Sequence, residues 1–333
     1  MTRAEGQGAI QHLTDGAALL RMPNAEALDL ASALRDRPPP GLLDAVPGAC
    51  TLLLLFDPDL LDHRALAEAL GRLGTARGRA EVRIVRLEAS YGGADGPDLA
   101  PLSREAGLSE GELVRLHAGA EHTVAFLGFA PGFAYLSGAP AAFAVPRLPS
   151  PRIRVPPGSI AVADGYTGIY PSATPGGWRL IGRIAQRLFD PSSTPPALLR
   201  PGDRVIFEPV PAHALGAFPE AATPQPSGRV PVARVLAPGP FTTVQGGPRH
   251  GLASSGVPSG GAMDLPALLE ANARVGNAPA SAGLEVTLAG PELEVLASAR
   301  IAVAGGEVDL VLQERKLGGP GPHDLRAGDR LKL

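Results

Sequence analysis

The sequence predicts a mainly β protein with a small α/β domain at its N-terminus. Its 333 residues include 42 glycines and 36 prolines, the residue types that all-β folds use in their frequent turns. Short apolar segments separated by Gly and Pro turns fill residues 88–210, a pattern typical of a closed or nearly closed β-barrel. Residues 10–85 alternate strand-like and helix-like segments instead, which indicates a compact α/β unit.

The α/β domain, residues 1–87, is built from five predicted elements. Apolar or alternating segments predict strands at residues 17–22, 51–56 and 81–87. Apolar residues at helical spacing predict helices at residues 25–34 and 62–73. Asp62 can cap the second helix. Cys50 directly precedes the apolar run TLLLLF, so we expect a buried, inert thiol, and a single cysteine permits no disulfide within the chain.

The barrel segment, residues 88–210, also contains a helix signal. Ser109 and Glu112 form a capping-box pattern before an apolar stretch. Residues 211–229 are Ala, Pro and polar residues without periodicity, and we interpret them as a semi-rigid linker.

The C-terminal segment, residues 230–333, begins a new unit. A strand pattern and a long Gly-rich loop precede a predicted helix at residues 265–275, with Asp264 as its N-cap and Pro266 in its first turn. Alternating segments then predict two or three strands. Residues 201–205 (PGDRV) and 327–331 (AGDRL) are each a turn followed by a strand. Common use of Gly-Asp in turns explains this echo more simply than a repeated architecture does.

Charge and motif content exclude several classes of function. The net charge is -3, from 30 basic and 33 acidic residues, which gives no electrostatic footprint for nucleic acid or an anionic membrane. No run of 18 apolar residues occurs, so we expect no membrane partner, and the single cysteine fits a reducing cytoplasm. The seven histidines form no HxxxH or HExxH pattern, so we expect no metal site. The sequence also lacks a GxxxxGK[ST] phosphate loop and a GxSxG elbow.

Residues 126–183 are the strongest candidate for a binding site. They hold the only tryptophan and three of the four tyrosines among many glycines and prolines. Rigid loops that carry aromatic and arginine side chains suit a small-molecule site, although a turn-rich barrel has the same composition. Arg147, Arg152 and Arg154 can clamp a carboxylate or phosphate, or form a solvated charged edge. Tyr170 and Trp178 can stack on a ligand or belong to the core.

Other polar residues have both a functional and a structural interpretation. Asp98 precedes a predicted helix and can act as its cap or in catalysis. His117 lies at a helix end, where it can cap the helix or transfer protons, and His122 fits a surface strand. In the last unit, candidate ligand-binding residues lie along one loop and one helix: Gln245, Arg249, Asp264 and Asn272. Asn272 has poor propensity for a helix interior, so we expect it to have a polar partner.

Several motifs resemble those of a known family. They are YGG..GPDL (91–99), LH (116–117), FLGFAPGFAYL (126–136), VPPGS (155–159), TGIYP (167–171), PGGW (175–178) and IGR (181–183). Over about residues 10–210 the chain resembles the B subunit of 5-oxoprolinase, also called KipI-like or allophanate hydrolase subunit 1. TTVQ, GVPSGGAMD and LE.TL.GPEL in residues 230–333 resemble the N-terminal part of the C subunit, the KipA-like, biotin-dependent carboxyltransferase-like partner. The chain therefore looks like a B–C fusion.

The resemblance implies a cyclophilin-like β-barrel for each half and a part in the ATP-dependent opening of 5-oxoproline to glutamate. It implies ATP with Mg as the cofactor, a LamB/YcsF-type A subunit of 5-oxoprolinase as partner, a full-length C subunit of the same enzyme as a further candidate partner, and no biotin on this chain. It also suggests Asp98 and His117 for proton transfer or substrate positioning. Gln245 is followed by Gly-Gly-Pro where the family has Asp, and the C-type part has about a third of its usual length.

Two alternative functions stay open. One is a carboxyltransferase domain of the urea carboxylase or allophanate hydrolase type, because that enzyme contains the same paired domains. The other is a KipI-like inhibitor of a histidine kinase, which would need an exposed apolar patch on the barrel.

Overall fold

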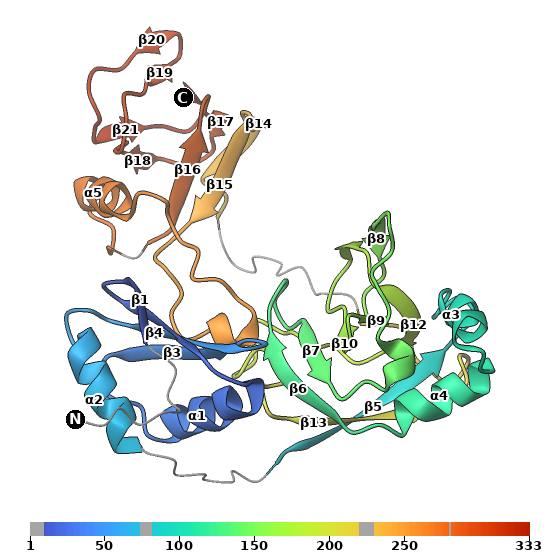
Figure 1. Cartoon of the computed structure of the whole chain (residues 1–333). Coiled ribbons are helices and arrows are strands. Elements are labelled where there is room, and N and C mark those ends of the chain that lie inside the picture. Colours follow the sequence, from blue (N-terminus) through green and yellow to red (C-terminus); the bar gives the residue numbers. More distant parts are fainter. Residues whose placement is uncertain (1–9, 74–81, 220–229, 280) are drawn as a thin grey trace. The chain divides into compact units, whose positions relative to one another are not determined.

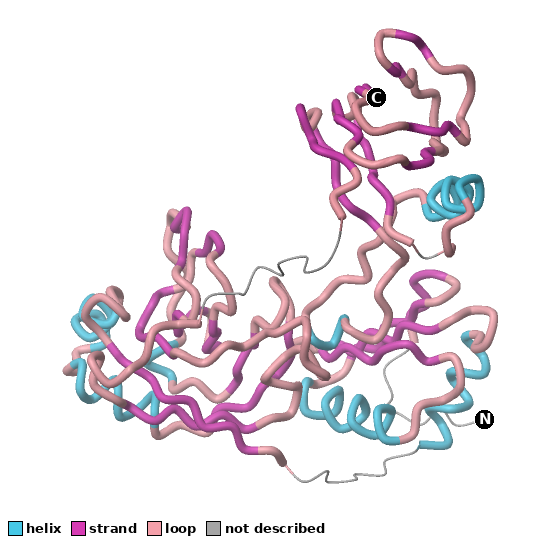
Figure 2. Tube along the Cα trace, turned by 180° about the vertical axis from the view of Figure 1, so that it is seen from behind, coloured by secondary structure: helices cyan, strands magenta, loops and turns pink. Residues whose placement is uncertain are grey.

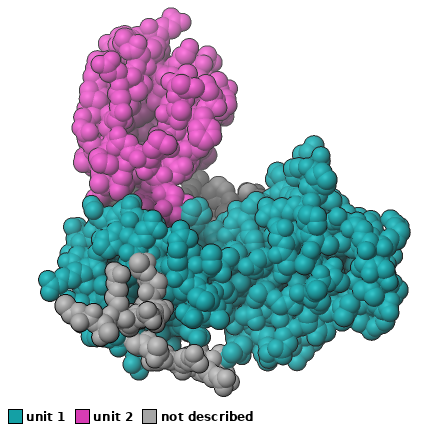
Figure 3. Space-filling view, viewed as in Figure 1, with its two compact units in different colours: residues 1–221, 250–258 teal, residues 222–249, 259–333 magenta. Residues whose placement is uncertain are grey.

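The computed structural model describes residues 10–73, 82–219, 230–279 and 281–333, and the chain divides into two compact units (Figure 3). Unit 1 comprises residues 1–221 together with residues 250–258. Unit 2 comprises residues 222–249 and 259–333. Unit 1 therefore contains both the α/β segment and the barrel segment. Of the predicted linker, residues 220–229 lie outside the described residues, and residues 211–219 form no helix or strand.

An antiparallel sheet with two helices forms the N-terminal part of unit 1 (Figure 1). Its strands, in sheet order, are β1 (Gln11–Thr14), β2 (Ala17–Arg21), β4 (Thr51–Phe56) and β3 (Leu42–Pro47). The helices are α1 (Asn24–Asp36) and α2 (His63–Leu73). Alternate residues of β4 are buried against them, namely Leu52, Leu54 and Phe56. Both predicted helices are confirmed, and the carboxylate of Asp62 caps α2 through the N–H of Ala65 at 2.7 Å.

The other side chains of β4, Thr51, Leu53 and Leu55, are half-buried. One expectation about this layer is wrong. Cys50 is exposed, since it lies in the turn between β3 and β4 and not within the strand. The third predicted strand belongs to the barrel.

A closed seven-stranded barrel forms the rest of unit 1, which confirms the mainly β prediction. In order around the barrel its strands are β10 (Tyr166–Ile169), β7 (Ala134–Ser137), β6 (His122–Leu127), β13 (Arg204–Pro209), β5 (Ile84–Tyr91), β12 (Arg179–Ile184) and β9 (Ser159–Ala163). Neighbouring strands are antiparallel except for β13 and β5, which are parallel. Two further strands, β8 (Arg152–Val155) and β11 (Thr174–Gly176), pair with each other outside the barrel.

Helices α3 (Leu99–Ala106) and α4 (Glu110–Ala118) pack on the barrel (Figures 1 and 2). Buried leucines from both helices, Leu99, Leu102 and Leu113, join the barrel core. The predicted capping box is present, because Ser109 and Glu112 exchange side-chain and backbone hydrogen bonds at the start of α4. A short 3₁₀ helix, η1 (Ala141–Phe143), adds the buried ring of Phe143.

The described part of unit 2 consists of small sheets and one helix. A five-stranded sheet has the order β14 (Ala233–Ala237), β17 (Glu292–Val295), β22 (Arg330–Lys332), β19 (Val311–Leu312) and β20 (Arg315–Lys316). The remaining strands pair as β15 (Phe241–Gln245) with β16 (Gly283–Thr287) and β18 (Ala299–Ile301) with β21 (His323–Leu325). The described part of unit 2 therefore contains no closed barrel. Its helix, α5 (Leu265–Val275), has the predicted bounds, and Asp264 caps it through the N–H of Ala267 at 2.9 Å.

Two turns, one in each unit, share the same hydrogen-bond pattern. They are residues 200–203, before β13, and residues 326–329, before β22. In both, the aspartate carboxylate accepts the N–H three residues earlier at 2.7 Å. The two glycines have φ of 92° and 91°, and each donates its N–H to a valine carbonyl, of Val124 or Val295, at 2.8 Å. The two segments therefore share a local turn with the same hydrogen bonds, as the common use of Gly-Asp in turns predicts.

Candidate functional site

Aromatic side chains gather on one side of the barrel. This aromatic cluster comprises Phe126, Phe129, Phe133, Tyr135, Tyr166, Tyr170 and Trp178. The buried ring of Phe133 lies edge-on to Tyr170 at 5.0 Å and to Trp178 at 6.0 Å between centroids. Such edge-to-face pairs stabilise a packed arrangement beyond the area that they bury. The cluster is therefore partly a core, with half-buried rings of Tyr135 and Tyr166 at its border.

Phe129 is the exposed member of the cluster. Its side chain is 64% exposed, and its φ of 71° lies in the left-handed region that aromatic residues rarely adopt. Backbone strain of this kind persists only where surrounding contacts hold it, and it concentrates at functional sites. The ring is held against Phe133 and Tyr170, at 5.2 and 6.3 Å. Phe129 therefore marks the cluster as a candidate binding surface.

Glycines make room for these rings. A Cβ added at Gly168, on β10, would lie 2.8 Å from the Phe133 ring and 3.0 Å from the Trp178 ring. A Cβ added at Gly176 would overlap the Tyr170 ring. Packing thus explains the glycines of the TGIYP and PGGW motifs, because a larger side chain there would clash with the aromatic cluster.

Arg147 adds a positive charge to this surface. Its guanidinium lies 5.9 Å from the centroid of the Trp178 ring, and its Nε donates to Asp164 Oδ2 at 3.2 Å. Both side chains of this ion pair are more than half exposed, so the pair contributes little stability. A ligand carboxylate can therefore replace Asp164 at small cost.

Arg152, the second arginine of the site, has hydrogen-bond partners within the protein. Arg152 Nη2 donates to Asp98 Oδ1 at 2.7 Å, and the N–H of Leu180 donates to Asp98 Oδ2 at 2.6 Å. Asp98 stands at the N-cap position of α3, but its side chain makes no cap hydrogen bond. The helix-cap interpretation is therefore wrong, because the carboxylate turns to β12 and to Arg152 instead. Arg152 also contacts the carbonyl of Trp178, at 3.4 Å, which ties this pair to the aromatic cluster.

Two of the sequence motifs meet around β12. The N–H groups of Gly92 and Asp98 donate to the carbonyls of Ile181 and Leu180, at 3.1 and 2.9 Å. Arg183 donates to Asp95 Oδ1 at 2.7 Å, and both side chains are largely buried. These contacts bind the YGGADGPDL segment to the strand that carries IGR. They leave Asp95 and Asp98 with arginine partners inside the protein.

His117 lies in a different network, in the barrel core. Its ring is fully buried and bonds with Tyr91 Oη at 2.9 Å and Thr167 Oγ1 at 3.0 Å. Burial holds the pKa of His117 well below 6.5, and the neighbouring His122 lowers that pKa further. His122 is itself buried, contrary to the surface interpretation, and contacts the carbonyl of His117 at 2.9 Å. His117 is therefore a core residue whose burial favours the neutral ring. Its role in proton transfer stays a prediction.

The remaining predicted site residues are dispersed. Arg154 is exposed on β8. In unit 2, Gln245 donates to Thr243 Oγ1 at 3.2 Å, and Asp264 caps α5. Arg249 lies in unit 2 as well, with its guanidinium against Gly260.

Asn272 has the polar partners that its poor helix propensity predicts. Its Nδ2 donates to the carbonyls of Pro279 and Ser281, at 3.2 and 2.8 Å, and its Oδ1 accepts from Asn277 at 3.1 Å. The structure thus assembles Asp98, Arg147, Arg152, Tyr170 and Trp178 from the prediction and leaves the other candidates apart.

Sequence reasoning missed the residues that complete this site. Phe129, Phe133 and Tyr135 all lie in FLGFAPGFAYL, whose density of aromatic residues was the available signal. Their convergence with Trp178 depends on barrel closure, which no local pattern reports. Among the described residues, no group of three or more His, Cys, Asp or Glu side chains can hold a metal ion, and no helix is long and apolar enough to cross a membrane.

Comparison with protein families gives two matches. A family described as carboxyltransferase domain, subdomain C and D, matches residues 9–199. A second, described as carboxyltransferase domain, subdomain A and B, matches residues 255–333.

Individual relatives agree with this division. The chain is 44% identical to the 5-oxoprolinase B subunit of Escherichia coli O157:H7 over 183 residues, which cover 54% of the chain and 83% of that protein. It is 35% identical to the B subunit of Bacillus subtilis (strain 168) over 219 residues, 60% of the chain and 91% of that protein. A further match, to the 5-oxoprolinase C subunit of Escherichia coli (strain K12), has 35% identity over 100 residues, 30% of the chain and 32% of that protein.

A solved structure shares the fold across nearly the whole chain. The crystal structure of TTHA0988 matches with a TM-score of 0.81 and 35% sequence identity over 96% of this chain. The match covers 65% of the TTHA0988 chain, so the present chain spans less than two thirds of that protein.

Proposed function

The chain belongs to the family of carboxyltransferase domains with subdomains C and D, and from this premise we propose that it is a component of an ATP-dependent 5-oxoprolinase. The observation that carries the proposal is the 44% identity across 83% of the length of a 5-oxoprolinase B subunit. The reaction opens the lactam of 5-oxoproline with water to give glutamate, coupled to hydrolysis of ATP to ADP and phosphate.

We assign substrate binding to the aromatic cluster and Arg147. The five-membered ring of 5-oxoproline is flat and carries one carboxylate. Half-buried aromatic rings can cover the ring faces, and the Arg147 guanidinium can take the carboxylate in place of Asp164. The displaced Asp164 side chain is more than half exposed, so water can solvate its carboxylate once Arg147 holds the ligand. The Arg152–Asp98 pair then positions β8 and Trp178 and does not contact the reacting atoms.

The lactam needs activation before water can attack it at neutral pH. ATP would supply that activation within the enzyme complex, by making the carbonyl carbon more electrophilic. The residues of the barrel do not fit a Mg–ATP site. Asp95 and Asp98 are paired with arginines, and no acidic cluster suited to a cation occurs among the residues that the structure describes. We therefore propose that the nucleotide lies on a partner protein, the LamB/YcsF-type component of the enzyme.

The C-terminal part of the chain supports a second candidate, a carboxyltransferase component. That part is 35% identical to a 5-oxoprolinase C subunit over 100 residues and 35% identical to urea amidolyase of Lachancea kluyveri over 100 residues. The longer match over unit 1 favours 5-oxoprolinase.

The decisive experiment measures release of glutamate from 5-oxoproline and ATP. The chain is mixed with the LamB/YcsF-type component, with and without a full-length C-type component. We expect activity that depends on this chain and that Arg147→Gln reduces about tenfold or more, through a higher KM. Dependence on the added C-type component would mean that unit 2 does not replace it. Folded protein with no glutamate release in either mixture would contradict the proposal, and transfer of a carboxyl group from a biotinylated carrier would then support the second candidate.

A further inference from the structure

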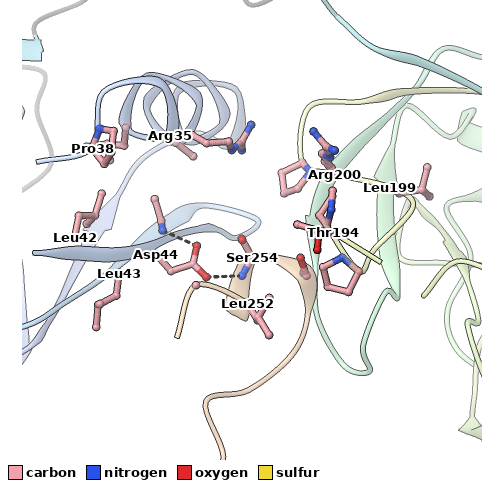
Figure 4. A pocket seen from close by; sticks show the side chains of 18 residues that line it. Arg35, Pro38, Leu42, Leu43, Asp44, Thr194, Leu199, Arg200, Leu252 and Ser254 are labelled. Carbon is pink, nitrogen blue, oxygen red and sulfur yellow. Dashed lines mark hydrogen bonds between the residues drawn. The ribbon is translucent and has the colours of Figure 1, made fainter. Parts of the chain in front are cut away.

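Unit 1 contains a pocket of about 490 Å³ that lies apart from the aromatic cluster (Figure 4). It is lined by the end of α1, by β3, by the loop at residues 194–201 and by residues 251–255. Its volume falls in the range of small-molecule sites. Neither the motifs nor the proposed function uses this pocket.

A segment from the C-type half closes one side of the pocket. Residues 250–258 belong to unit 1, although the chain on both sides of them belongs to unit 2. Asp44 Oδ2, on β3, accepts the N–H of Ser254 at 3.0 Å, and the carbonyl of Ser255 accepts the N–H of Gly132 at 3.0 Å. The short 3₁₀ helix η2 (Ala253–Ser255) is thus fixed to the α/β layer and to the barrel. This part of the pocket wall has a defined shape.

Two arginines supply positive charge to the pocket. Arg35 reaches it from the last turn of α1 and Arg200 from the loop before β13, and Figure 4 shows both guanidinium groups in the gap between helix and loop. Neither arginine has a carboxylate within ion-pair distance among the described residues. The lining also contains one carboxylate, that of Asp44. It accepts hydrogen bonds from the backbone N–H groups of Ala45, at 2.8 Å, and of Ser254.

The rest of the lining is mainly apolar. It comprises leucine, proline and alanine side chains from α1, β3 and the loop at residues 194–201, together with Pro38 and Leu252. Thr194, Ser254 and Ser255 add hydroxyl groups. A ligand that fits must therefore combine an anionic head with an apolar body.

The charge balance decides which anion fits. Two guanidinium groups and one carboxylate leave one net positive charge, which matches a carboxylate monoanion. A phosphate dianion would leave excess negative charge beside Asp44 in a partly apolar site, and an unbalanced charge there is costly. We propose that this pocket binds a small carboxylic acid, with its carboxylate between Arg35 and Arg200 and its apolar part against the leucine and proline side chains. The proposal is independent of the proposed function.

Calorimetric titration of the full chain with hexanoate tests the proposal, with inorganic phosphate as competitor. We expect hexanoate to bind and phosphate not to displace it. Arg35→Gln and Arg200→Gln should each weaken binding about tenfold, because a charge-assisted hydrogen bond is lost. Arg37→Gln is the matched control, since Arg37 follows the same helix but does not line the pocket, and it should leave the affinity unchanged.

A variant of the acidic residue sharpens the test. Asp44→Asn removes the negative charge and keeps the side-chain size, so phosphate should begin to compete with hexanoate. Circular dichroism of each variant confirms that it is folded. The proposal is overturned if hexanoate does not bind at 10 mM, taken as about the weakest affinity of interest. It is also overturned if both arginine variants bind hexanoate as tightly as the parent does, or if the parent binds phosphate more tightly than hexanoate. Loss of hexanoate binding in Arg147→Gln alone would likewise overturn it, because the ligand would then lie at the aromatic cluster.

Discussion

Arg152 Nη2 lies 2.7 Å from Asp98 Oδ1, and this ion pair joins the outer strand β8 to the start of α3. Asp98 also accepts the N–H of Leu180, at 2.6 Å, so one carboxylate connects three parts of unit 1. Its side chain is 12% exposed and that of Arg152 is 28% exposed. The pair is therefore neither fully buried nor a surface contact, and its main role is to hold β8 beside the aromatic cluster.

We expect Asp98→Asn to destabilise unit 1 by about 1–3 kcal/mol. Loss of one partner from a fully buried pair costs about 3–5 kcal/mol, and partial exposure of Arg152 reduces that cost. Urea unfolding followed by Trp178 fluorescence measures the change. The matched control is Glu68→Gln, which breaks the exposed pair with Arg64 on α2 and should change stability by less than about 0.5 kcal/mol. If both substitutions changed the free energy of unfolding equally, the Asp98–Arg152 pair would not stabilise unit 1 more than a surface ion pair does.

The buried histidines predict that unit 1 loses stability in mild acid. Burial lowers the pKa of His117 well below 6.5 and also lowers that of His122, so the folded protein binds these protons less readily than the unfolded chain does. The unfolded chain takes up these protons below about pH 6.5, so the free energy of unfolding falls as pH decreases from there toward the folded pKa values. Each ring contributes up to about 1.4 kcal/mol per pH unit. Above pH 7 the two histidines contribute no pH dependence.

His117→Gln separates this effect from general acid sensitivity. Glutamine can keep a hydrogen bond to Tyr91 or Thr167 but does not titrate, so the variant should be less stable at pH 7.5 yet lose less stability between pH 7 and 5.5. Urea unfolding at several pH values gives the two slopes. The same slope in both proteins would show that the His117 ring is not held neutral by the fold. His12→Gln, at an exposed histidine, is the control.

Local signals in the sequence predicted local structure well. Ser109 with Glu112, Asp62 and Asp264 each cap a helix as expected, because capping requires only residues within one turn. The turn at residues 326–329 follows the same logic. These interactions are encoded within four residues and need no tertiary information.

Signals that depend on tertiary contacts were misinterpreted. Asp98 stands where a cap belongs, but a stronger set of partners, Arg152 and the N–H of Leu180, lies far away in sequence. His122 has a strand neighbourhood that fits either face, and barrel closure turns it inward. The aromatic cluster was only half predicted for the same reason, since Trp178 and Phe133 are brought together by strands that are not consecutive.

Trp178 provides a direct test of ligand binding at the aromatic cluster. It is the only tryptophan, and Arg147 lies over its ring. We expect 5-oxoproline to change Trp178 fluorescence in a saturable titration, because its carboxylate draws Arg147 away from Asp164 and the ring. Arg147→Gln should weaken the apparent affinity about tenfold. Arg86→Gln, which removes a mostly exposed arginine paired with Glu208, should not. A titration curve identical in parent and Arg147→Gln would remove Arg147 from the site.

Replacement of Gly168, the glycine of TGIYP, should disturb the packing of the aromatic cluster. Gly168→Ala places a methyl group 2.8 Å from Phe133 and 3.0 Å from Trp178, inside a packed cluster, and overpacking of this kind costs about 1–3 kcal/mol. Gly71→Ala is the opposite case, because nothing lies within 4 Å of its added Cβ and the residue is inside α2. That change should stabilise the protein by about 0.5–1 kcal/mol. Thermal unfolding should therefore move in opposite directions, and a Gly168→Ala variant of unchanged stability would show that the cluster is loosely packed.

The repeated turn allows the two units to be compared by one substitution. Asp203 is 5% exposed, accepts the N–H of Arg200 and pairs with Arg83, whereas Asp329 is less buried and accepts the N–H of Arg326 and a hydrogen bond from Gln313. Asp203→Asn leaves the Arg83 charge without its partner, so we expect a cost of about 2–3 kcal/mol, against about 1 kcal/mol for Asp329→Asn. Since Trp178 lies in unit 1, its fluorescence should report the first loss and not the second, while circular dichroism should report both. If Asp329→Asn also shifted the Trp178 transition by as much as Asp203→Asn, the two units would unfold as one cooperative body, and the turn in unit 2 would contribute to the stability of the barrel.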